Sequence, residues 1–429
     1  MIKTVYTWAR LIDIAANKKN AIVDGPFGSS LKVSDYVDSG IPVLQGKNIT
    51  SNKFAWDYIR FISKEKAEEL KRSKVIVGDI LVVKIGSVGY SAEITDLNGY
   101  PFAIIPANLA KVTVDETKVS KKYLLHWLNS PIMTNHLKSI ASKTAQPALS
   151  LSKIKEIPIP LPPLHIQKQI VQVLDEADAL IQKRKQAIAK LDELVQSVFL
   201  EMFGDPVKNH FRWHLVEFKE LGAWKSGGTP SRKQNHFFKG DIDWYTAGEL
   251  NEMFLKGSKE KISLEAINHS SAKLFEPGSL LIGMYDTAAF KLGILEKVSS
   301  ANQACANLTP DTSLLNVIWA YTNFKIMRPY YLSQRRGVRQ KNLTLGMIQS
   351  FKTPLPPIHL QNQYAKLLME IQSQKSLKQK QLDKLEENFQ SLLQRAYRGE
   401  LSFSTDQEGD GDAAQRGISG EVSAVEVGS

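Results

Sequence analysis

Two long stretches of the chain carry apolar residues at intervals that alternate between three and four positions. This spacing is the pattern of a coiled-coil seam. It predicts one helix after Pro163 and another after Pro357, each of about 38 residues and roughly 57 Å long. We expect Gly204 and Gly399 to end them. The expected seam positions are Ile166, Ile170, Val173, Ala177, Leu180, Ala187, Leu191, Leu194, Val198 and Met202, then Leu360, Tyr364, Leu367, Ile371, Leu385, Phe389, Leu392 and Ala396.

The two predicted helices belong to an internal repeat. The stretch Leu161–Gln169 returns, 194 positions later, as Leu355–Gln363, with both Pro-Pro pairs and both following Gln residues in register. A period of this length indicates a duplicated pair of modules, because solenoid repeats span only about 20–50 residues. Each module is a mixed domain followed by a helix. A pseudo-twofold relation would pack the helices together as an antiparallel pair; the alternative is homodimerisation through them.

The segments before the helices alternate short apolar runs with polar turns. Residues 80–85 and 280–285 are expected to be buried strands, and residues 121–137 and 314–332 to be helices. The predicted fold class is therefore α+β, with two tandem mixed α/β domains separated by two long helices that form an antiparallel coiled coil. The expected boundaries are 1–157 for the first domain, 158–205 for the central helix, 206–351 for the second domain, 352–401 for the C-terminal helix, and 402–429 for a disordered acidic tail.

Charge points to a polyanionic partner. The formal net charge is +11, although the segment 402–429 contains six acidic residues and one arginine. The rest of the chain is therefore more basic than the total, which suits an electrostatic field that attracts nucleic acid. The single cysteine, Cys305, excludes an internal disulfide and fits a reducing compartment. No apolar run has the length of a membrane span, and we expect a cytoplasmic protein without a membrane partner.

Motifs for chemistry on DNA are missing from the sequence. The Pro-Pro pairs lack the preceding acid or amide that an adenine methyltransferase needs to hold a flipped base, and no P-loop is present. The Glu-x-Lys triplets at 116–118 and 217–219 are expected by chance in a chain rich in Lys and Glu. His210 and His214 are four positions apart, but no Glu or Cys accompanies them, so we expect no metal site. The sequence predicts a binding protein with no catalytic residue.

Polar side chains beside glycines make up the candidate DNA interface. Groove recognition uses Arg, Lys, Asn and Gln on base edges and further cations on phosphates. Corresponding loops of the two modules differ chemically where the residues around them agree, as two readers of different half-sites would. A solvated loop is the alternative for each. The candidates are Gln45, Lys47, Asn48, Lys84, Ser87, Tyr90, Lys143 and Gln146 in the first module, then Thr246, Glu249, Tyr285, Thr287, Arg335, Arg336, Arg339, Gln340 and Lys341 in the second.

The chain resembles the specificity subunits of type I restriction-modification systems up to about Leu401. The resemblance rests on both Leu-Pro-Pro helices together with short motifs in a fixed order. These motifs are Gly25–Lys32, Gly40–Leu44 and Gly78–Leu81, then Gly227–Ser231, Ala301–Ala304 and Ala396–Leu401.

The resemblance implies two target-recognition domains that each read one half of an interrupted site in double-stranded DNA. It also implies two methyltransferase subunits and a motor-nuclease subunit as partners, with S-adenosylmethionine, ATP and Mg on those partners and no cofactor in this chain. Two alternatives remain at this point: a stand-alone DNA-binding scaffold or regulator, and a coiled-coil structural protein.

Overall fold

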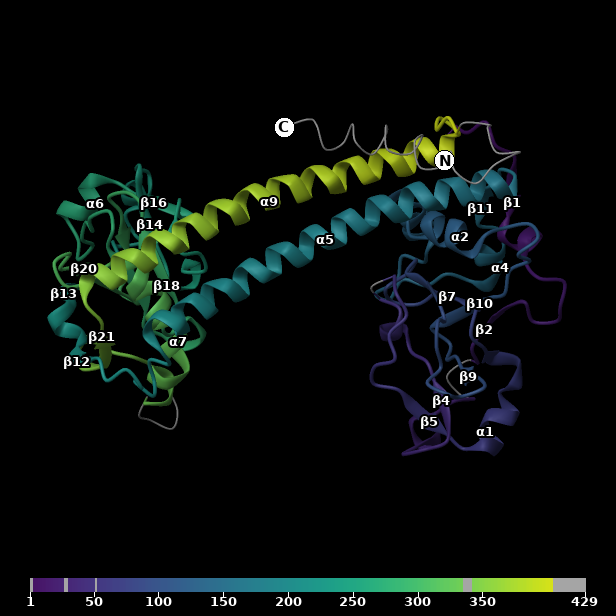
Figure 1. Cartoon of the computed structure of the whole chain (residues 1–429), viewed down its shortest axis with the longest axis horizontal. Coiled ribbons are helices and arrows are strands. Elements are labelled where there is room, and N and C mark those ends of the chain that lie inside the picture. The colour runs from purple at the N-terminus through teal and green to yellow at the C-terminus, as the bar shows by residue number, and fades with distance from the viewer. Residues whose placement is uncertain (1–2, 27–29, 51, 335–341, 404–429) are drawn as a thin grey trace. The chain divides into compact units, whose positions relative to one another are not determined.

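A computed structural model describes residues 3–26, 30–50, 52–334 and 342–403. The chain divides into two compact units. Unit 1 consists of Met1–Lys185 and Lys380–Ser429, and unit 2 is Gln186–Gln379. Two long helices, α5 (Leu164–Phe203) and α9 (Ile358–Arg398), each contribute one part to unit 1 and one part to unit 2. Figure 1 labels the main elements of both units.

Unit 1 contains a four-stranded sheet, a five-stranded sheet and a short strand pair. The four-stranded sheet has the order β2-β10-β7-β8, with bounds Ile22–Asp24, Leu109–Val112, Ile80–Val83 and Ser91–Glu93. The five-stranded sheet has the order β3-β5-β4-β9-β6, with bounds Tyr36–Val37, Arg60–Ile62, Ile41–Val43, Ala103–Ile104 and Lys74–Val75. The pair joins β1 (Trp8–Arg10) to β11 (Pro158–Pro160).

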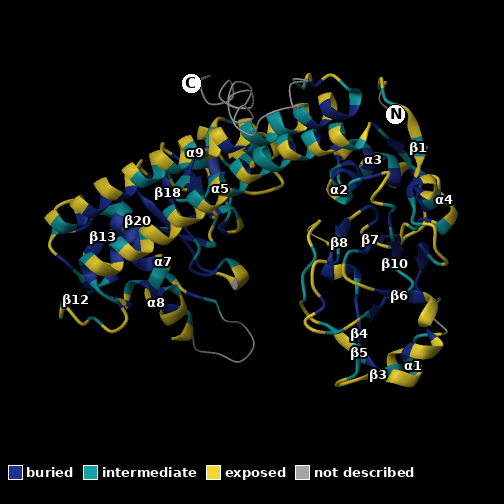
Figure 2. Ribbon diagram, turned by 45° about the vertical axis from the view of Figure 1, so that its right-hand side comes forward, coloured by how far each residue is buried: buried dark blue, intermediate teal, exposed yellow. Residues whose placement is uncertain are grey.

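The central strand β7 is buried on both faces, which explains its unbroken apolar sequence. Ile80 and Val82 belong to the core that packs against the helices, whereas Leu81 and Val83 belong to a second core shared with the five-stranded sheet. Successive side chains of a strand point to opposite faces, so one strand serves both cores. Figure 1 shows the resulting layers of unit 1, with α2 on one side of β7 and β10 and the strands β4 and β5 on the other, and Figure 2 shows how deeply they are buried.

The helices of unit 1 are short apart from α5 and α9. The expected single helix over residues 121–137 is two helices, because Ser130 accepts a hydrogen bond from the Met133 amide and caps a new helix that begins at Pro131. Proline fits the first helical position, where its missing N–H costs nothing. The bounds are α1 Lys64–Glu69, α2 Lys121–Leu128, α3 Pro131–Ile140 and α4 Leu151–Lys155, with 3₁₀ turns η1 Leu11–Ile14, η2 Val33–Asp35, η3 Gly46–Asn48 and η4 Lys71–Ser73.

Unit 2 repeats this plan. Its five-stranded sheet has the order β13-β20-β17-β18-β15, with bounds Gly222–Ser226, Cys305–Pro310, Leu280–Gly283, Leu292–Leu295 and Phe254–Leu255. A three-stranded sheet has the order β16-β14-β19, with bounds Glu260–Ile262, Ile242–Tyr245 and Ser300–Ala301. A strand pair joins β12 (His214–Glu217) to β21 (Lys352–Leu355).

The central strand of unit 2, β17, divides its side chains as β7 does. Leu280 and Ile282 face the core beneath the helices, and Leu281 faces a second core. The expected helix over residues 314–332 is α7, which continues through Pro329. The remaining bounds are α6 Leu264–Asn268, α7 Val317–Ser333 and α8 Leu345–Gln349, with 3₁₀ turns η5 Phe218–Leu221, η6 Asn235–Phe238, η7 Ala247–Glu249 and η8 Asp286–Ala288.

The long helices pack against each other in opposite directions. In unit 1 the beginning of α5, through Ile170 and Leu174, shares a core with the end of α9, through Leu393 and Tyr397. In unit 2 the end of α5, through Phe199 and Phe203, shares a core with the beginning of α9, through Tyr364 and Leu368. Within each unit the start of one helix therefore meets the end of the other. The fold class predicted from the sequence, including the antiparallel helix pair within the chain, is confirmed.

The buried positions of α5 differ from the expected seam. Leu174, Ile181, Phe199 and Phe203 are buried, whereas Leu194 is 43% exposed. The buried residues near each end face both α9 and the globular core of the unit. A helix with 3.6 residues per turn also drifts away from a strict seven-residue repeat. These two causes together explain why a seam assigned by sequence spacing alone was wrong at these positions.

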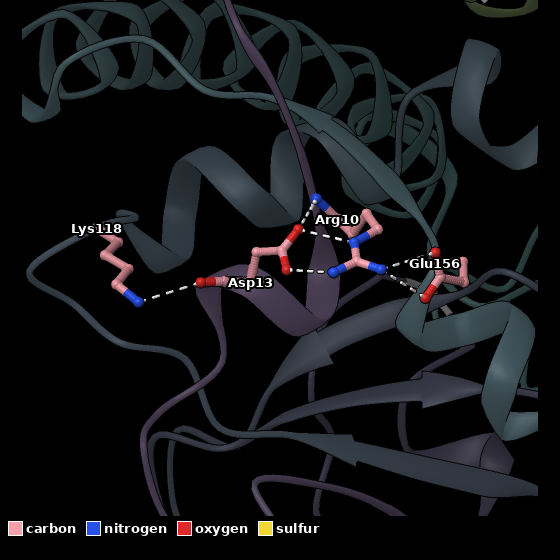
Figure 3. A network of polar contacts seen from close by, with 4 residues as sticks. All are labelled: Arg10, Asp13, Lys118 and Glu156. Atoms are coloured by element: carbon pink, nitrogen blue, oxygen red, sulfur yellow. Dashed lines mark hydrogen bonds and ion pairs between the residues drawn. The ribbon is translucent and has the colours of Figure 1, made fainter.

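An exposed polar network fixes the start of unit 1 (Figure 3). The guanidinium of Arg10 donates to both carboxylate oxygens of Asp13, at 2.9 and 2.8 Å, and reaches Glu156 at 3.4 Å. Lys118 donates to the Asp13 carbonyl oxygen at 3.2 Å. The Arg10 hydrogen bonds, first through the side chain and then through the backbone amide, lower the pKa of Asp13 to about 2. The network ties β1 and η1 to the end of α4.

No helix among the described residues is long and apolar enough to cross a membrane.

Candidate DNA interface

The chain leaves β7 through a backbone frame that joins three distant segments. The Lys84 amide donates to the Asn108 carbonyl oxygen at 2.9 Å, and the Lys84 carbonyl oxygen accepts from the Leu149 amide at 2.7 Å. Backbone hydrogen bonds of this kind hold loops in register as a sheet would. The loop after β7 is therefore fixed between the segment before β10 and the segment before α4.

Unit 2 has the same frame after β17. The Met284 amide donates to the Ala304 carbonyl oxygen at 2.8 Å, and the Met284 carbonyl oxygen accepts from the Leu343 amide at 2.7 Å. Lys84 thus corresponds to Met284, and Asn108 to Ala304. The backbone geometry is repeated while the side chains on it are different.

Three loops that the sequence singled out lie side by side in unit 1. The Gly86 amide donates to the Pro147 carbonyl oxygen at 3.0 Å, and a Cβ atom at Gly86 would lie 3.9 Å from Gln146 Nε2. A Cβ atom at Gly46 would lie 3.1 Å from Asn108 Nδ2. The segment 84–90 therefore lies beside residues 146–147 and, through the Lys84 amide, beside Asn108, whose side chain lies near Gly46.

Most predicted residues of unit 1 are exposed to solvent. The exposed side chains are Lys47, Ser87, Tyr90, Lys143 and Gln146, and Gln45 is half-buried. Lysine, amide, hydroxyl and phenol groups are the donors and acceptors that contact phosphates and base edges. The exposed side chains thus have the chemistry that a nucleic-acid interface uses.

Lys84 has a structural role instead. Its side chain is buried, and its ammonium group donates to Asp24 Oδ2 at 2.5 Å, while Arg72 lies 3.6 Å from the other Asp24 oxygen. A buried charge must be paired to remain in the folded chain. The burial of Lys84 argues against direct DNA contact by its side chain.

Asn48 is also buried. Its side-chain oxygen accepts from the Gln45 amide at 2.7 Å, and its Nδ2 donates to the carbonyl oxygens of Ala55 and Asp57 at 2.9 and 2.7 Å. These contacts use the amide group at both ends. Asn48 therefore shapes the loop rather than facing outward.

In unit 2 the predicted residues divide in the same way. Thr246 and Glu249 pair with each other, because the Thr246 amide and hydroxyl donate to Glu249 Oε2 at 2.9 and 2.7 Å. The other Glu249 oxygen accepts from the Lys259 amide at 2.8 Å. Tyr285 and Thr287 are exposed. The five remaining candidates, Arg335, Arg336, Arg339, Gln340 and Lys341, lie outside the described residues.

Sequence reasoning missed Asn108. Its half-buried side chain lies beside Gly46, and its carbonyl oxygen accepts from the Lys84 amide. Its position beside a buried strand gave no sign of this role. A comparison of the repeats provides the missing signal, because an amide in unit 1 corresponds to an alanine in unit 2 within an otherwise equal frame.

The described residues contain no cluster of three or more His, Cys, Asp or Glu side chains able to hold a metal ion. The lone cysteine is buried in β20, and burial, with a smaller contribution from Glu249, raises the pKa of Cys305 to about 12. Its thiol therefore stays protonated at neutral pH and is a poor nucleophile.

The two units repeat one backbone frame and carry different side chains on it, as the two domains of a duplicated recognition protein would. The family described as the type I restriction modification DNA specificity domain matches residues 26–192 and 212–387. These matches cover well over half of the chain, and the chain belongs to this family.

Relatives and solved structures agree with this assignment. A putative type I restriction enzyme MjaX specificity subunit from Methanocaldococcus jannaschii is 23% identical over 382 residues, which is 85% of this chain and 88% of the relative. The structure of a type I restriction-modification S subunit from M. genitalium has a TM-score of 0.52 and 14% identity, covering 94% of this chain and all but 1% of that one.

A second structure, described as the basis of complex assembly and conformational transition of the type I R-M system, has a TM-score of 0.61 and 18% identity. It covers 94% of this chain and 100% of its own. At these identities the two structures establish the fold, and the family match carries the assignment as a type I specificity subunit.

Proposed function

We propose that each unit reads one half of an interrupted site in double-stranded DNA. The chain thereby positions two N6-adenine methyltransferase subunits and a motor-nuclease subunit on that site. S-adenosylmethionine, ATP and Mg would be bound by those partners, and this chain would contribute recognition without catalysis. Relatives of this chain are themselves described as specificity subunits.

One observation carries the proposal: the same backbone frame presents different side chains in the two units. The hydrogen bonds around Lys84 and around Met284 agree to within 0.1 Å. At corresponding positions of this frame, Lys84, Ile85 and Asn108 in unit 1 are replaced by Met284, Tyr285 and Ala304 in unit 2. Base recognition depends on side chains, whereas their placement depends on the frame. Two readers of different sequences need this combination.

Electrostatics supports a DNA ligand. The net charge of +11 supplies the field that sequence-independent phosphate binding requires. Phosphate contacts position the protein, and base contacts then select the sequence.

An exchange of recognition units tests the bipartite reading. Residues 1–157 are replaced by the corresponding segment of another type I specificity subunit, and the complex is assembled with its methyltransferase partners. Methylated adenines are then mapped on random DNA. We expect a change in one half of the recognised site only. The matched control replaces residues 206–351 instead and should change only the other half. A change in both halves by either exchange would contradict independent reading.

A separate measurement tests the partners. The full chain is mixed with candidate methyltransferase subunits, and both DNA binding and methyl transfer are recorded. A specificity subunit supports site-specific methylation, whereas a stand-alone regulator binds DNA without supporting it. A chain that binds neither DNA nor a methyltransferase would contradict the proposal.

A further inference from the structure

Tyr58 is exposed in a way that the fold does not require. Its side chain is 81% exposed, and its φ is 53°. A positive φ is unfavourable for residues other than glycine, and most of all for bulky ones. Such backbone strain is concentrated at binding sites. A tyrosine that packs into no core gains little that offsets this cost, so the exposed ring calls for another explanation.

The loop that carries Tyr58 is held from one side by Asn48. The two carbonyl oxygens that accept from Asn48 Nδ2 belong to Ala55 and Asp57, the latter directly before Tyr58. The Ala55 amide in turn donates to the Asn48 carbonyl oxygen at 2.8 Å. Asn48 therefore fixes the backbone from which the Tyr58 side chain projects.

Aromatic packing holds the other side of the same loop. Trp56 stacks on Tyr100 with ring centroids 6.0 Å apart, and Phe54 lies 6.4 Å from Trp56. All three rings pack against the core between the two sheets of unit 1. The loop is thus rigid on both sides, and the exposure of Tyr58 is built into it.

The corresponding position in unit 2 shows that the fold can do without this tyrosine. Ser63 and Ser263 cap equivalent helices, each accepting from an amide three residues later at 3.1 Å. In this register Tyr58 corresponds to Ser258. The Ser258 hydroxyl turns inward, where it accepts from the Trp244 amide at 3.0 Å and donates to the Glu260 carbonyl oxygen at 2.5 Å. An outward tyrosine is therefore particular to unit 1.

A lysine accompanies the exposed ring. Lys47 Nζ lies 4.7 Å from the centroid of the Tyr58 ring, within the range of a cation–π contact. The lysine covers one face of the ring, which leaves that face unavailable for stacking on a base. The pair thus combines a neutral hydroxyl donor with a positive charge, which is the donor set that a phosphate accepts.

We propose that Tyr58 and Lys47 bind one phosphate of the DNA backbone, and that Asn48 acts as a positioning residue by fixing the loop. This inference rests on the proposed function and adds a contact that anchors unit 1 without reading sequence. The Tyr58 hydroxyl donates to a phosphate oxygen, while the Lys47 ammonium group neutralises its charge.

The proposed phosphate contact, called the phosphate clamp below, can be tested by fluorescence anisotropy. A fluorescein-labelled random-sequence duplex is titrated with the full chain at salt concentrations between about 50 and 200 mM. We expect Tyr58→Phe to weaken binding about tenfold, because it removes a hydrogen bond to a charged acceptor, and to leave the salt dependence unchanged. Lys47→Met should lower the slope of log affinity against log salt by about 0.9. Val33→Ala and Lys71→Met, at exposed sites of the same unit, are the matched controls. Val33→Ala should not weaken binding as Tyr58→Phe does, and Lys71→Met should not lower the salt slope as Lys47→Met does.

Asn48 is tested through its effect on Tyr58. Asn48→Asp keeps the acceptor for the Gln45 amide but loses both donors. It should weaken DNA binding in the wild-type background and add little when Tyr58→Phe is already present, because coupled residues are not additive. Equal losses in both backgrounds would overturn the positioning role.

The outcomes separate the clamp from the function on which it rests. If Tyr58→Phe keeps wild-type affinity while Tyr58→Ala loses it, the ring stacks on bases and the phosphate clamp is wrong. If both variants bind as wild type does, Tyr58 is not at the DNA. A wild-type chain that binds no duplex, alone or assembled with methyltransferase subunits, would refute the proposed function itself.

Discussion

Gln167 and Gln361 make the same three hydrogen bonds at equivalent positions of the two units. The side-chain oxygen of Gln167 accepts from the Ser120 amide at 2.8 Å, and that of Gln361 accepts from the Asn316 amide at 2.9 Å. Gln167 Nε2 donates to the Pro162 and Lys118 carbonyl oxygens at 2.8 and 3.1 Å. Gln361 Nε2 donates to those of Pro356 and Leu314 at 2.8 and 3.0 Å.

This relationship gives the repeated Leu-Pro-Pro motif a physical meaning. Both glutamines are fully buried. Each satisfies the N-cap amide of an earlier helix, α2 or α7, and the carbonyl oxygen of the proline just before its own long helix. In each unit, the hydrogen bonds of one glutamine thereby hold the first turn of a long helix against its domain.

Replacing either glutamine by leucine should therefore destabilise the chain. Each substitution removes the buried hydrogen bond to the Pro162 or Pro356 carbonyl oxygen and two part-buried hydrogen bonds, and a buried group left unsatisfied costs about 1–3 kcal/mol. Urea denaturation monitored by circular dichroism measures the loss. Gln172→Leu, on the exposed face of α5, is the matched control and should change stability by less than about 0.5 kcal/mol. Equal effects at Gln167 and Gln172 would contradict a buried anchoring role.

Asp13 gives unit 1 a contribution to stability that depends on pH. The pKa of Asp13 is lowered from 3.8 to about 2 by Arg10. A carboxylate whose pKa is lowered on folding stabilises the folded chain above its unfolded pKa. This contribution decreases as the pH falls from about 4 toward 2.

Asp13→Asn should remove this part of the pH dependence, and added salt should weaken it because the pair is exposed. Melting temperatures recorded at several pH values between about 2 and 5 test this expectation. Asp38→Asn, at an exposed carboxylate outside the network, is the control. A wild-type profile retained in Asp13→Asn would show that the network does not stabilise unit 1.

Cys305 should resist modification in the folded chain. Its buried thiol has a pKa near 12, and the thiolate is the form that reacts with alkylating agents. Iodoacetamide at neutral pH should therefore label the folded chain slowly and the chain in guanidinium rapidly, as read by mass spectrometry. Rapid labelling of the native chain would show that β20 opens readily in solution.

The basic segment that contains Arg335, Arg336, Arg339 and Lys341 should contribute phosphate contacts to unit 2. A variant with alanine at all four positions is expected to bind DNA more weakly, with a salt slope reduced by about 0.9 for each phosphate contact that is lost. Duplex binding at several salt concentrations measures both quantities. Unchanged affinity and slope would remove this segment from the interface.

Much of the fold could be predicted from the sequence because its signals are local. Pro163 and Gly204 bound α5, since proline is favoured at helix starts and Gly204 adopts a φ of 73°. The apolar runs of β7 and β17 mark strands buried on both faces. The duplication was visible in the spacing of identical residues.

The site was harder to predict because its side chains are sorted by tertiary contacts. Lys84 resembles a surface lysine beside a glycine loop, yet its partner Asp24 lies 60 positions earlier. Tyr58 carries no motif, and its exposure depends on a backbone angle and on hydrogen bonds from Asn48. In both cases the informative signal was a difference between the repeats.

Asp24 and Lys84 test whether residues that differ together between the repeats interact with each other. They form a buried ion pair in unit 1, and the positions that correspond to them in unit 2 hold Ser226 and Met284. The strand pairing supports this correspondence, because Asp24 is opposite Ala110 on β10 as Ser226 is opposite Ala306 on β20. The two residues thus differ together, as partners in one interaction would.

Lys84→Met alone should destabilise unit 1, by up to about 3–5 kcal/mol, because the buried Asp24 carboxylate then keeps only the exposed Arg72, at 3.6 Å, as an ion partner. The double variant Asp24→Ser with Lys84→Met reproduces the uncharged pair of unit 2 and should recover most of that loss. Replacing a buried ion pair by a compatible uncharged pair is often close to neutral. Urea denaturation of the two single variants and the double variant gives the coupling energy directly. Additive losses would show that the two side chains do not depend on each other, and that their difference between the repeats has another cause.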